Sequence, residues 1–401
     1  MRTITAHRTE AMPLNYLTEE EKKFQSEVRN FAESFVSPHI YEMDAAARLN
    51  KEVIRQVIDK GLMKIEIPLE YGGLGKPFIY SVFAIEEMAI IDPAVAVFID
   101  VQNTLVVNAI MRWGTQQQKQ KYLSMFANGT IGAFSITEKE AGSDATTMTC
   151  KAEKTDGGYI INGVKHWVTN AAEADIFIVF CKIVEPNSTK TSNEGRLTAF
   201  IVDKREAKGF TICEPEEKMG IRASSTCDTI YENVFVPEEN ILGSPGRGLM
   251  VALETLTDGR IGISAQMLGL AQGAFNAAVE YSEKRKQFGE YISTYQGIHF
   301  PIAQMATELH AARLLVYNTA RMKMAKGDFK ELMHHSSMAK LYASQVAERV
   351  VSQSLEIFGG KGYMKGNALE KLFRDAKIGT IYEGTSNIQL RTIARQYVKI
   401  K

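Results

Sequence analysis

The feature that most constrains the fold of this chain is that its hydrophobic periodicity changes twice. Apolar residues recur at helical spacing at first, then gather in strand-like runs, and then return to helical spacing. This order predicts a mainly α protein with a central β domain. We expect a separate start over residues 1–15, an N-terminal helical domain over 16–130, a middle β domain over 131–244 and a C-terminal helical bundle over 245–401.

Local patterns place some of the helices and strands. Thr18 and Glu21 form a capping-box pattern, which predicts that a helix starts there. In the middle zone, Asn162-Gly163 stands between β-forming residues, so we expect a hairpin turn at this pair. Ile176–Phe180 and Phe200–Val202 have the composition of buried strands.

The last zone carries two helical rows. One row has small side chains four residues apart, which lets another helix approach closely: Ala265, Gly269, Gly273 and Ala277. The other has the 3-4-3-4 apolar spacing of a long bundle helix: Ile302, Met305, Leu309, Ala312 and Val316.

Composition is that of a soluble globular enzyme and argues against several other classes. The chain has 47 basic and 47 acidic residues, so we expect no nucleic-acid partner. No apolar run approaches the ~20 residues that span a bilayer. The cysteines form no CxxC pair, so we expect reduced thiols and no metal site: Cys150, Cys181, Cys213 and Cys227.

The start of the chain leaves two interpretations open. It is basic and rich in hydroxyl groups, with no acidic residue before Glu10. Residues 1–15 are therefore either the remnant of a mitochondrial transit peptide or a disordered start.

Nucleotide-binding motifs of the common kinds are absent. No GxGxxG follows a strand, so a Rossmann site is not supported. Gly359-Gly360-Lys361-Gly362 lacks the spacing of a phosphate loop, and by itself it predicts a glycine turn that closes a helix.

Four segments carry residues suited to chemistry: 134–144, 167–169, 257–260 and 381–389. Each residue also has an ordinary structural interpretation. Glu383 alone is more often a solvated acid, Trp167 a core residue, and Arg260 a surface cation. Ser143 and Thr385 are also typical helix N-caps.

The four segments occur together in the order typical of one family, the acyl-CoA dehydrogenases, which the chain resembles from about Leu17 to its C-terminus. Further stretches that resemble its signatures are 373–377, 382–386 and 284–289 followed by Gln296. The stretches 95–98, 102–105, 222–227, 259–263 and 265–273 most resemble its short/branched-chain subgroup.

The resemblance implies a fold, an activity and partners. It implies a helical domain, a β domain and a four-helix bundle, usually in a homotetramer with one FAD per subunit. The implied reaction is α,β-dehydrogenation of a short or 2-methyl-branched acyl-CoA to the trans-2-enoyl-CoA, in fatty-acid or branched-chain amino-acid catabolism. Electrons would pass to electron-transfer flavoprotein in the mitochondrial matrix, and no membrane span is implied.

The resemblance also implies residue roles. Glu383 would be the catalytic base. The residues implied for FAD are Phe134, Ser135, Ile136, Thr137, Gly142, Ser143, Trp167, Val168, Thr169, Thr385, Ser386 and Asn387, with Arg285, Gln296, Glu356, Ile357, Phe358, Gly359 and Gly360 reaching a neighbouring subunit's FAD. The residues implied for the substrate are Ser143, Thr257, Asp258, Gly259, Arg260 and Gly384.

The chain also departs from the family pattern. Some members carry the base one residue before the equivalent of Arg260, where this chain has Gly259. Lys139-Glu140 replaces a pair that usually ends in glycine, so backbone strain is expected if Glu140 takes a positive φ. The 186–195 loop is also longer than usual.

Two other functions remain open on the sequence. One is an acyl-CoA oxidase, which is normally longer, with an extra C-terminal domain. The other is a non-catalytic acyl-CoA-binding protein on the same fold, although Glu383 and Trp167 are both present.

Overall fold

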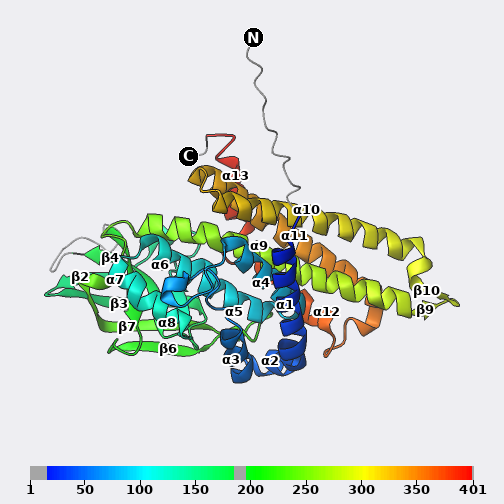
Figure 1. The fold of residues 1–401 in the computed structure, drawn as a ribbon, viewed down its shortest axis with the longest axis horizontal. Helices are drawn as coiled ribbons and strands as arrows, with labels where there is room; N and C mark the ends of the chain where they lie inside the picture. Colours follow the sequence, from blue (N-terminus) through cyan, green and yellow to red (C-terminus); the bar gives the residue numbers. More distant parts are fainter. Residues whose placement is uncertain (1–15, 185–195, 400–401) are drawn as a thin grey trace, which may run out of the picture.

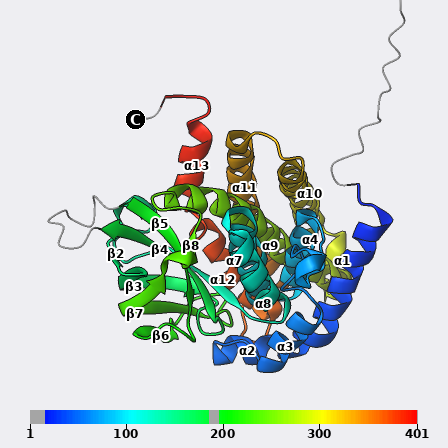
Figure 2. The same cartoon turned by 60° about the vertical axis from the view of Figure 1, so that its left-hand side comes forward.

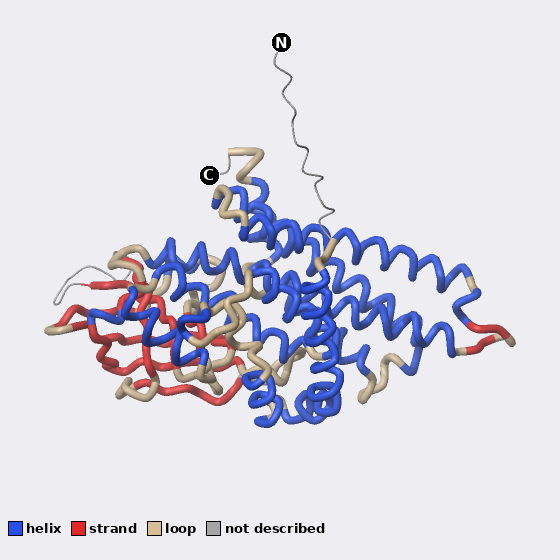
Figure 3. The backbone as a smooth tube through the Cα atoms, viewed as in Figure 1, coloured by secondary structure: helices blue, strands red, loops and turns tan. Residues whose placement is uncertain are grey.

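The structure is a computed structural model that describes residues 16–184 and 196–399 (Figure 1). The expectations for residues 1–15 and for the 186–195 loop fall outside the described residues. Strands gather at one end of the molecule and long helices extend toward the other (Figure 3). The order helices, strands, helices agrees with the predicted fold class.

The first helical region runs to Ala127. Its helices are α1 (Glu19–Phe31), α2 (Ile40–Ala46), α3 (Lys51–Asp59), α4 (Phe78–Ile91), α5 (Pro93–Asp100), α6 (Asn108–Trp113), α7 (Gln116–Gln118) and α8 (Ser124–Ala127). The predicted capping box is present, because Thr18 Oγ1 accepts from Glu21 N at 3.2 Å and Glu21 Oε2 accepts from Thr18 N at 2.9 Å.

One helical span in this region is long and apolar enough to cross a membrane, although the sequence shows no unbroken apolar run of that length. α5, a π-helical stretch (Val101–Val107) and α6 together form a helix, Pro93–Trp113, that is long and apolar enough to cross a membrane, with a mean hydropathy of 1.6. It contains scattered polar residues, which is why no unbroken apolar run marks it in the sequence. Of its most apolar window, 94% is buried, so it packs as a core helix.

The middle region forms one sheet in the order β6-β7-β3-β2-β4-β5-β8, and β1 also pairs with β4 in parallel. Its strands are β1 (Gly132–Ser135), β2 (Lys151–Thr155), β3 (Gly158–Thr169), β4 (Ile176–Val184), β5 (Arg196–Asp203), β6 (Phe210–Pro215), β7 (Thr226–Pro237) and β8 (Ile241–Leu242). The predicted strands at 176–180 and 200–202 lie within β4 and β5.

The predicted hairpin turn at Asn162-Gly163 is wrong. β3 continues through this pair, which forms a bulge against β7, and the two-residue turn lies earlier, at Asp156-Gly157. Gly163 is required by close packing, because a Cβ there would stand 2.7 Å from Cys150 Sγ. Both pairs carry the same turn signal, so composition alone does not choose between them.

The last region is helical, as expected. It contains α9 (Gly248–Lys284), α10 (Gln296–Met324), α11 (Phe329–Phe358), α12 (Ala368–Ala376) and α13 (Ser386–Ala394), with a small hairpin of β9 (Lys286–Gln287) and β10 (Glu290–Tyr291). Met305, Leu309, Ala312 and Val316 are buried on α10, as their spacing predicts.

The predicted small-residue row on α9 faces α4. A Cβ on Gly269 would stand 2.1 Å from the Glu86 carbonyl oxygen, and one on Gly273 would stand 2.3 Å from that of Ile90. The two backbones therefore touch, which only glycine permits at these positions. Figure 2 shows α9 and α4 side by side between the sheet and α10.

Candidate active site

Glu383 lies in the loop between α12 and α13, in an unusual local environment. The residue is half-buried, but its carboxylate oxygen Oε2 is buried and has no hydrogen-bond partner among the described residues. Burial raises the pKa of Glu383 to about 7, and the cations of Arg260 and Lys340 oppose that rise. A carboxyl group with this pKa can gain and lose a proton near neutral pH.

The backbone at this point is strained. Glu383 has φ 52°, a left-handed conformation that non-glycine residues rarely adopt, and Gly384 follows at φ 87°. Gln389 on α13 holds the strained pair, since its Nε2 donates to the Glu383 carbonyl at 3.1 Å and to the Gly384 carbonyl at 2.8 Å. Such strain is retained where the surroundings fix a side chain in one direction.

Gly259 on α9 leaves the space that the carboxylate uses. A Cβ at this position would stand 2.9 Å from Glu383 Oε2 and 2.6 Å from Leu105 Cδ2. The sequence position where other family members carry the base is therefore directly beside this carboxylate. A carboxylate can therefore occupy this space from position 259 on α9 or from position 383 in the loop, but not from both.

Two cations lie behind the carboxylate. Arg260 is buried on α9, and its Nη1 donates to Ser337 Oγ on α11 at 3.3 Å. Lys340, also buried on α11, donates from Nζ to the Gly384 carbonyl at 2.7 Å. Burial lowers the pKa of Lys340 to about 7, and the neighbouring Glu383 opposes that fall.

A third ionisable group, Asp100 at the end of α5, also acts on this site. It is buried, and Thr104 Oγ1 donates to its Oδ1 at 2.8 Å. Burial and then the charge of Glu383 hold the pKa of Asp100 well above its usual range. Burial therefore disfavours a negative charge on Asp100 beside Glu383.

Trp167 is placed outward by a bulge in β3. The register of β3 against β7 shifts between Lys165 and Val168, and Trp167 has φ 56° with 60% of its surface exposed. Asp228 stabilises the bulge, because its carboxylate lies 2.8 Å from His166 Nδ1 and accepts from Trp167 N at 3.3 Å. An indole exposed this way offers a flat apolar surface for a ring system.

The predicted 134–144 segment lies beside this bulge. His166 N donates to the Thr137 carbonyl at 2.8 Å, and Lys165 Nζ donates to the Ile136 carbonyl at 3.1 Å. Phe134 and Ser135 are buried, whereas Gly142 and Ser143 are exposed. Glu140 is exposed and is not among the described residues with positive φ, so the strain expected there does not arise.

The helix core connects these elements to Glu383. Asn170, just after β3, donates from Nδ2 to the Phe98 carbonyl at 3.1 Å, and Gly132 N donates to Gln102 Oε1 at 2.8 Å. The same helical span carries Asp100 and Leu105, which pack against α9 beside Gly259 and Gly262. Val168 is buried and Thr169 half-buried at this junction.

The predicted substrate residues on α9 do not all face one way. Thr257 is buried and donates to the Leu253 carbonyl at 2.8 Å. Asp258 is buried against two cations, with Arg112 Nη2 at 3.1 Å and Lys323 Nζ at 2.9 Å. Asp258 is thus part of a buried ion cluster in this structure.

The residues after Glu383 begin α13. Thr385 is its N-cap and accepts from Ile388 N at 3.3 Å, Ser386 Oγ donates to the Thr380 carbonyl at 3.4 Å, and Asn387 is exposed. The N-cap interpretation of Thr385 is therefore confirmed. It leaves the helix start open to a ligand.

A second group of predicted residues lies at the opposite end of the bundle. Phe358 stacks on Tyr281 at 4.1 Å, which brings the ends of α9 and α11 together, and Gly359 ends α11 as the predicted glycine turn. At 1.5 Å per residue, the end of α9 lies ~36 Å along the axis from Arg260. Within one chain the structure therefore does not bring this group to Trp167 or Glu383 (Figure 1); the group is Arg285, Gln296, Glu356, Ile357, Phe358, Gly359 and Gly360.

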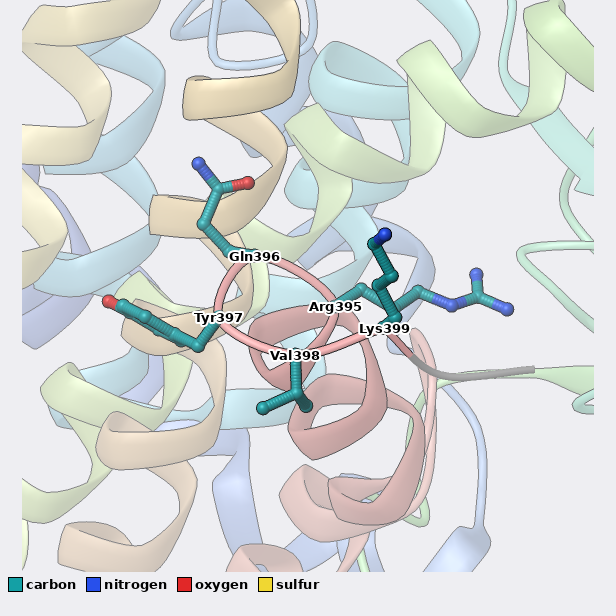
Figure 4. A pocket seen from close by; sticks show the side chains of 5 residues that line it. All are labelled: Arg395, Gln396, Tyr397, Val398 and Lys399. Carbon is teal, nitrogen blue, oxygen red and sulfur yellow. The ribbon is translucent and has the colours of Figure 1, made fainter.

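Four residues of the site were missed by sequence reasoning: Asp100, Asp228, Lys340 and Gln389. The signal for Lys340 is weak, since it is one lysine among small residues of a helix, and burial is not visible in the sequence. A hollow at the C-terminus is lined by consecutive residues of one turn, Arg395–Lys399, and contains none of the predicted residues (Figure 4).

The residues fit a flavin in two respects. The exposed Trp167 indole offers a stacking face, and the exposed Gly142 and Ser143 leave polar groups free nearby. The Glu383 carboxylate oxygen Oε2 is buried without a hydrogen-bond partner among the described residues, so it is free to accept a proton from a substrate C–H bond.

Comparisons with known proteins agree with this geometry. The N-terminal, middle and C-terminal domain models of acyl-CoA dehydrogenases match residues 18–130, 133–234 and 246–398. The chain is 46% identical to the probable short/branched chain specific acyl-CoA dehydrogenase of Dictyostelium discoideum, covering 100% of this chain and 95% of that protein. It is 45% identical to the mitochondrial short/branched chain specific acyl-CoA dehydrogenase of Rattus norvegicus, covering 96% of this chain and 87% of that protein.

A solved structure agrees as well. Butyryl-CoA dehydrogenase from Megasphaera elsdenii matches with a TM-score of 0.90 and 37% identity, covering 96% of this chain and 99% of that one. The chain therefore belongs to the acyl-CoA dehydrogenase family, and the protein is an acyl-CoA dehydrogenase, an oxidoreductase.

Proposed function

We propose that this protein dehydrogenates short or 2-methyl-branched acyl-CoA thioesters to trans-2-enoyl-CoA, with Glu383 as the base. The observation that carries the proposal is the Glu383 carboxylate: its Oε2 is buried and lacks a hydrogen-bond partner among the described residues, and burial raises its pKa to about 7. The C–H bond next to a thioester is weakly acidic, so its removal needs a carboxylate held close and away from water.

Glu383 takes the α-proton, and its neighbours determine how well it does so. Arg260 and Lys340 favour the ionised form of the carboxylate, and the left-handed backbone with Gln389 directs it toward the space beside Gly259. By family resemblance, the Glu383 backbone N–H stabilises the thioester oxygen as negative charge develops there.

FAD is the proposed cofactor. When bound, the flavin would accept the β-hydrogen of the substrate as hydride. Trp167 and Thr169 would orient the ring system, segment 134–143 would line its polar edge, and Thr385, Ser386 and Asn387 would complete the site. The distant residues, Arg285, Gln296 and Glu356–Gly360, would contribute to the FAD of a neighbouring subunit in the homotetramer that the resemblance implies.

The substrate class rests on the similarity to two short/branched chain specific relatives. Segment 257–260 would hold the CoA arm together with Ser143 and Gly384, and Leu105 lies where it would limit the acyl chain. Electron-transfer flavoprotein is the proposed electron acceptor. The mitochondrial matrix is the proposed location, since the rat relative is named as mitochondrial. The domain limits proposed from the sequence, 16–130, 131–244 and 245–401, are kept.

The test is anaerobic bleaching of the flavin absorbance. Purified protein would be mixed with 2-methylbutyryl-, butyryl-, isobutyryl-, isovaleryl- and octanoyl-CoA. Fast bleaching by a short or 2-methyl-branched thioester, abolished in Glu383→Gln, would support the reaction and the base.

A matched control is Glu87→Gln. Glu87 is another buried glutamate whose pKa burial raises to about 7, but it pairs with Arg29 at the α1–α4 contact. Glu87→Gln should bleach like wild type. A wild-type protein that binds these thioesters without bleaching would refute the proposal and leave a non-catalytic acyl-CoA-binding protein.

A further inference from the structure

We propose that Lys340 is a positioning residue for the base: its ammonium group fixes the backbone beside Glu383, and its positive charge favours the ionised form of the Glu383 carboxylate. This inference rests on the proposed function, because it assigns Lys340 a role through Glu383.

The geometry places the lysine against the loop that carries the base. Lys340 is fully buried on α11, and its Nζ donates to the Gly384 carbonyl at 2.7 Å. The same carbonyl accepts from Gln389 at 2.8 Å, so two side chains from different helices hold one peptide. The residue before that peptide is Glu383, with φ 52°.

A hydrogen bond to a carbonyl does not by itself require a lysine. One turn further along α11, the Ser344 hydroxyl lies 2.8 Å from the Gly379 carbonyl oxygen and 2.7 Å from the Lys340 carbonyl oxygen, and it can donate to one of them at a time. Ser344 thus contacts the same loop without any charge. Burying an ammonium group is costly, and interior lysines are rare unless they are paired. No acidic side chain lies within 4.0 Å of Lys340 Nζ among the described residues, so the longer-range interaction with Glu383 is the charge interaction left to explain it.

Every ionisable group that faces Glu383 can be named. Arg260 faces it from α9, Lys340 from α11 and Asp100 from the end of α5, while Tyr382 precedes it in the loop. Arg260 and Lys340 lower the pKa of Glu383, and burial raises the pKa values of Asp100 and Tyr382, which disfavours a negative charge on either group. Removal of Lys340 therefore leaves one cation to oppose burial.

The experiment compares the pH dependence of anaerobic flavin bleaching in four variants of the flavin-loaded enzyme. Lys340→Met removes the donor and the charge, Lys340→Gln keeps a donor without charge, and Lys340→Arg keeps the charge. Ser344→Ala is the matched control on the same helix.

The expected result separates charge from hydrogen bonding. The bleaching rate should fall on the acid side of the pH profile, where Glu383 becomes protonated; this part of the profile is the acid limb. Loss of one nearby cation should shift the midpoint of the acid limb to a pH about one unit higher in Lys340→Met and Lys340→Gln. With the Glu383 pKa at about 7 in wild type, the ionised fraction at pH 7, and with it the rate, should fall about fivefold. Lys340→Gln should recover more of the rate at high pH than Lys340→Met, Lys340→Arg should return the limb to the wild-type position or below, and Ser344→Ala should leave it unchanged.

A second readout does not depend on turnover. Infrared difference spectra between each protein and its Glu383→Gln counterpart follow the carbonyl stretch of the protonated Glu383 carboxyl across pH. The titration should shift in the same direction and by the same amount as the rate limb. If Lys340→Met does not fold, Lys340→Gln and Lys340→Arg carry the comparison.

Two results would overturn the inference. One is an acid limb and an infrared titration that stay at the wild-type position in both uncharged variants. The other is a uniform loss of rate at every pH that Ser344→Ala reproduces, which would leave Lys340 a structural residue. Failure of the wild type to bleach is a different outcome, since it refutes the dehydrogenase assignment, while the infrared titration still reports on Lys340.

Discussion

Gly259→Ala is the substitution that most directly tests how the site holds its carboxylate. The added methyl group would stand 2.6 Å from Leu105 Cδ2 and 2.9 Å from Glu383 Oε2, and real Cβ atoms essentially never approach below 3.0 Å. Both neighbours are side-chain ends, and to reach an ordinary contact of 3.4 Å Leu105 Cδ2 must move by about 0.8 Å and Glu383 Oε2 by about 0.5 Å. The added methyl group therefore displaces the carboxylate from the position that it holds beside Gly259.

The effects on stability and rate differ in size. Alanine improves the helix by about 1 kcal/mol over glycine, and overpacking costs about 1–3 kcal/mol. The free energy of unfolding should therefore fall by only about 0–2 kcal/mol. Misplacement by 1 Å can cost about 100-fold in rate, so a few tenths of an ångström should slow flavin bleaching about tenfold or less.

The assay is stopped-flow bleaching with 2-methylbutyryl-CoA, together with denaturant unfolding of the same samples. Gly269→Ala is the control, because its methyl group meets the Glu86 backbone at 2.1 Å, which yields less than a side chain. It should destabilise the fold more than Gly259→Ala, and its folded fraction should lose less of the bleaching rate, because no added atom meets Glu383. Wild-type bleaching by a measurably destabilised Gly259→Ala would show that Leu105 absorbs the clash and would refute the reasoning.

Three further predictions follow from individual contacts. Folding raises the pKa of Glu383 to about 7 from its model-peptide value of 4.5, so the wild-type protein loses stability as pH rises between these two values. The melting temperature of Glu383→Gln should therefore rise relative to that of wild type between pH 4.5 and 7, and the difference should stay level above pH 7. A constant difference from about pH 4 to 8 would contradict this. Asp375→Asn weakens a buried pair with Lys371 at 2.7 Å and a bond from Ile221 N at 2.5 Å, so it should lower the free energy of unfolding by about 3 kcal/mol in urea, and a loss under about 1 kcal/mol would show that the pair is dispensable. Trp167→Ala removes an exposed ring that lies outside the core, so the melting temperature of the flavin-free protein should stay unchanged. The dissociation constant of FAD, measured by fluorescence titration, should rise at least about tenfold because a stacking face is lost.

The sequence was sufficient for the order of the regions and for the helix contacts set by small or apolar periodicity. The α9 row and the Thr18 capping box were predicted because their signals are local. The turn at Asn162-Gly163 was wrong because the same dipeptide signal serves a turn and a bulge, and only the packing against Cys150 selects the bulge. Strand partners are set by such contacts, which lie far apart in the sequence.

The site divides in the same way. Glu383, Trp167 and Arg260 were named because they belong to segments that resemble a family. Lys340 and Asp100 were not named, because their importance comes from burial beside Glu383 rather than from any pattern around them. Electrostatic coupling depends on distance and dielectric environment, and neither is encoded at a single position.

The contact of α9 with α4 has a consequence for how the molecule tolerates heat and substitution. At Gly269 and Gly273 the distance between the helices is set by backbone atoms in contact, so no change of rotamer can widen or narrow it. The two helices therefore cannot come closer at this point, and thermal motion must occur in other parts of the molecule. Gly259 and Arg260 lie about 15 Å away on the same helix. The backbone contact between α9 and α4, rather than the side-chain packing of the bundle, therefore fixes where the active site lies.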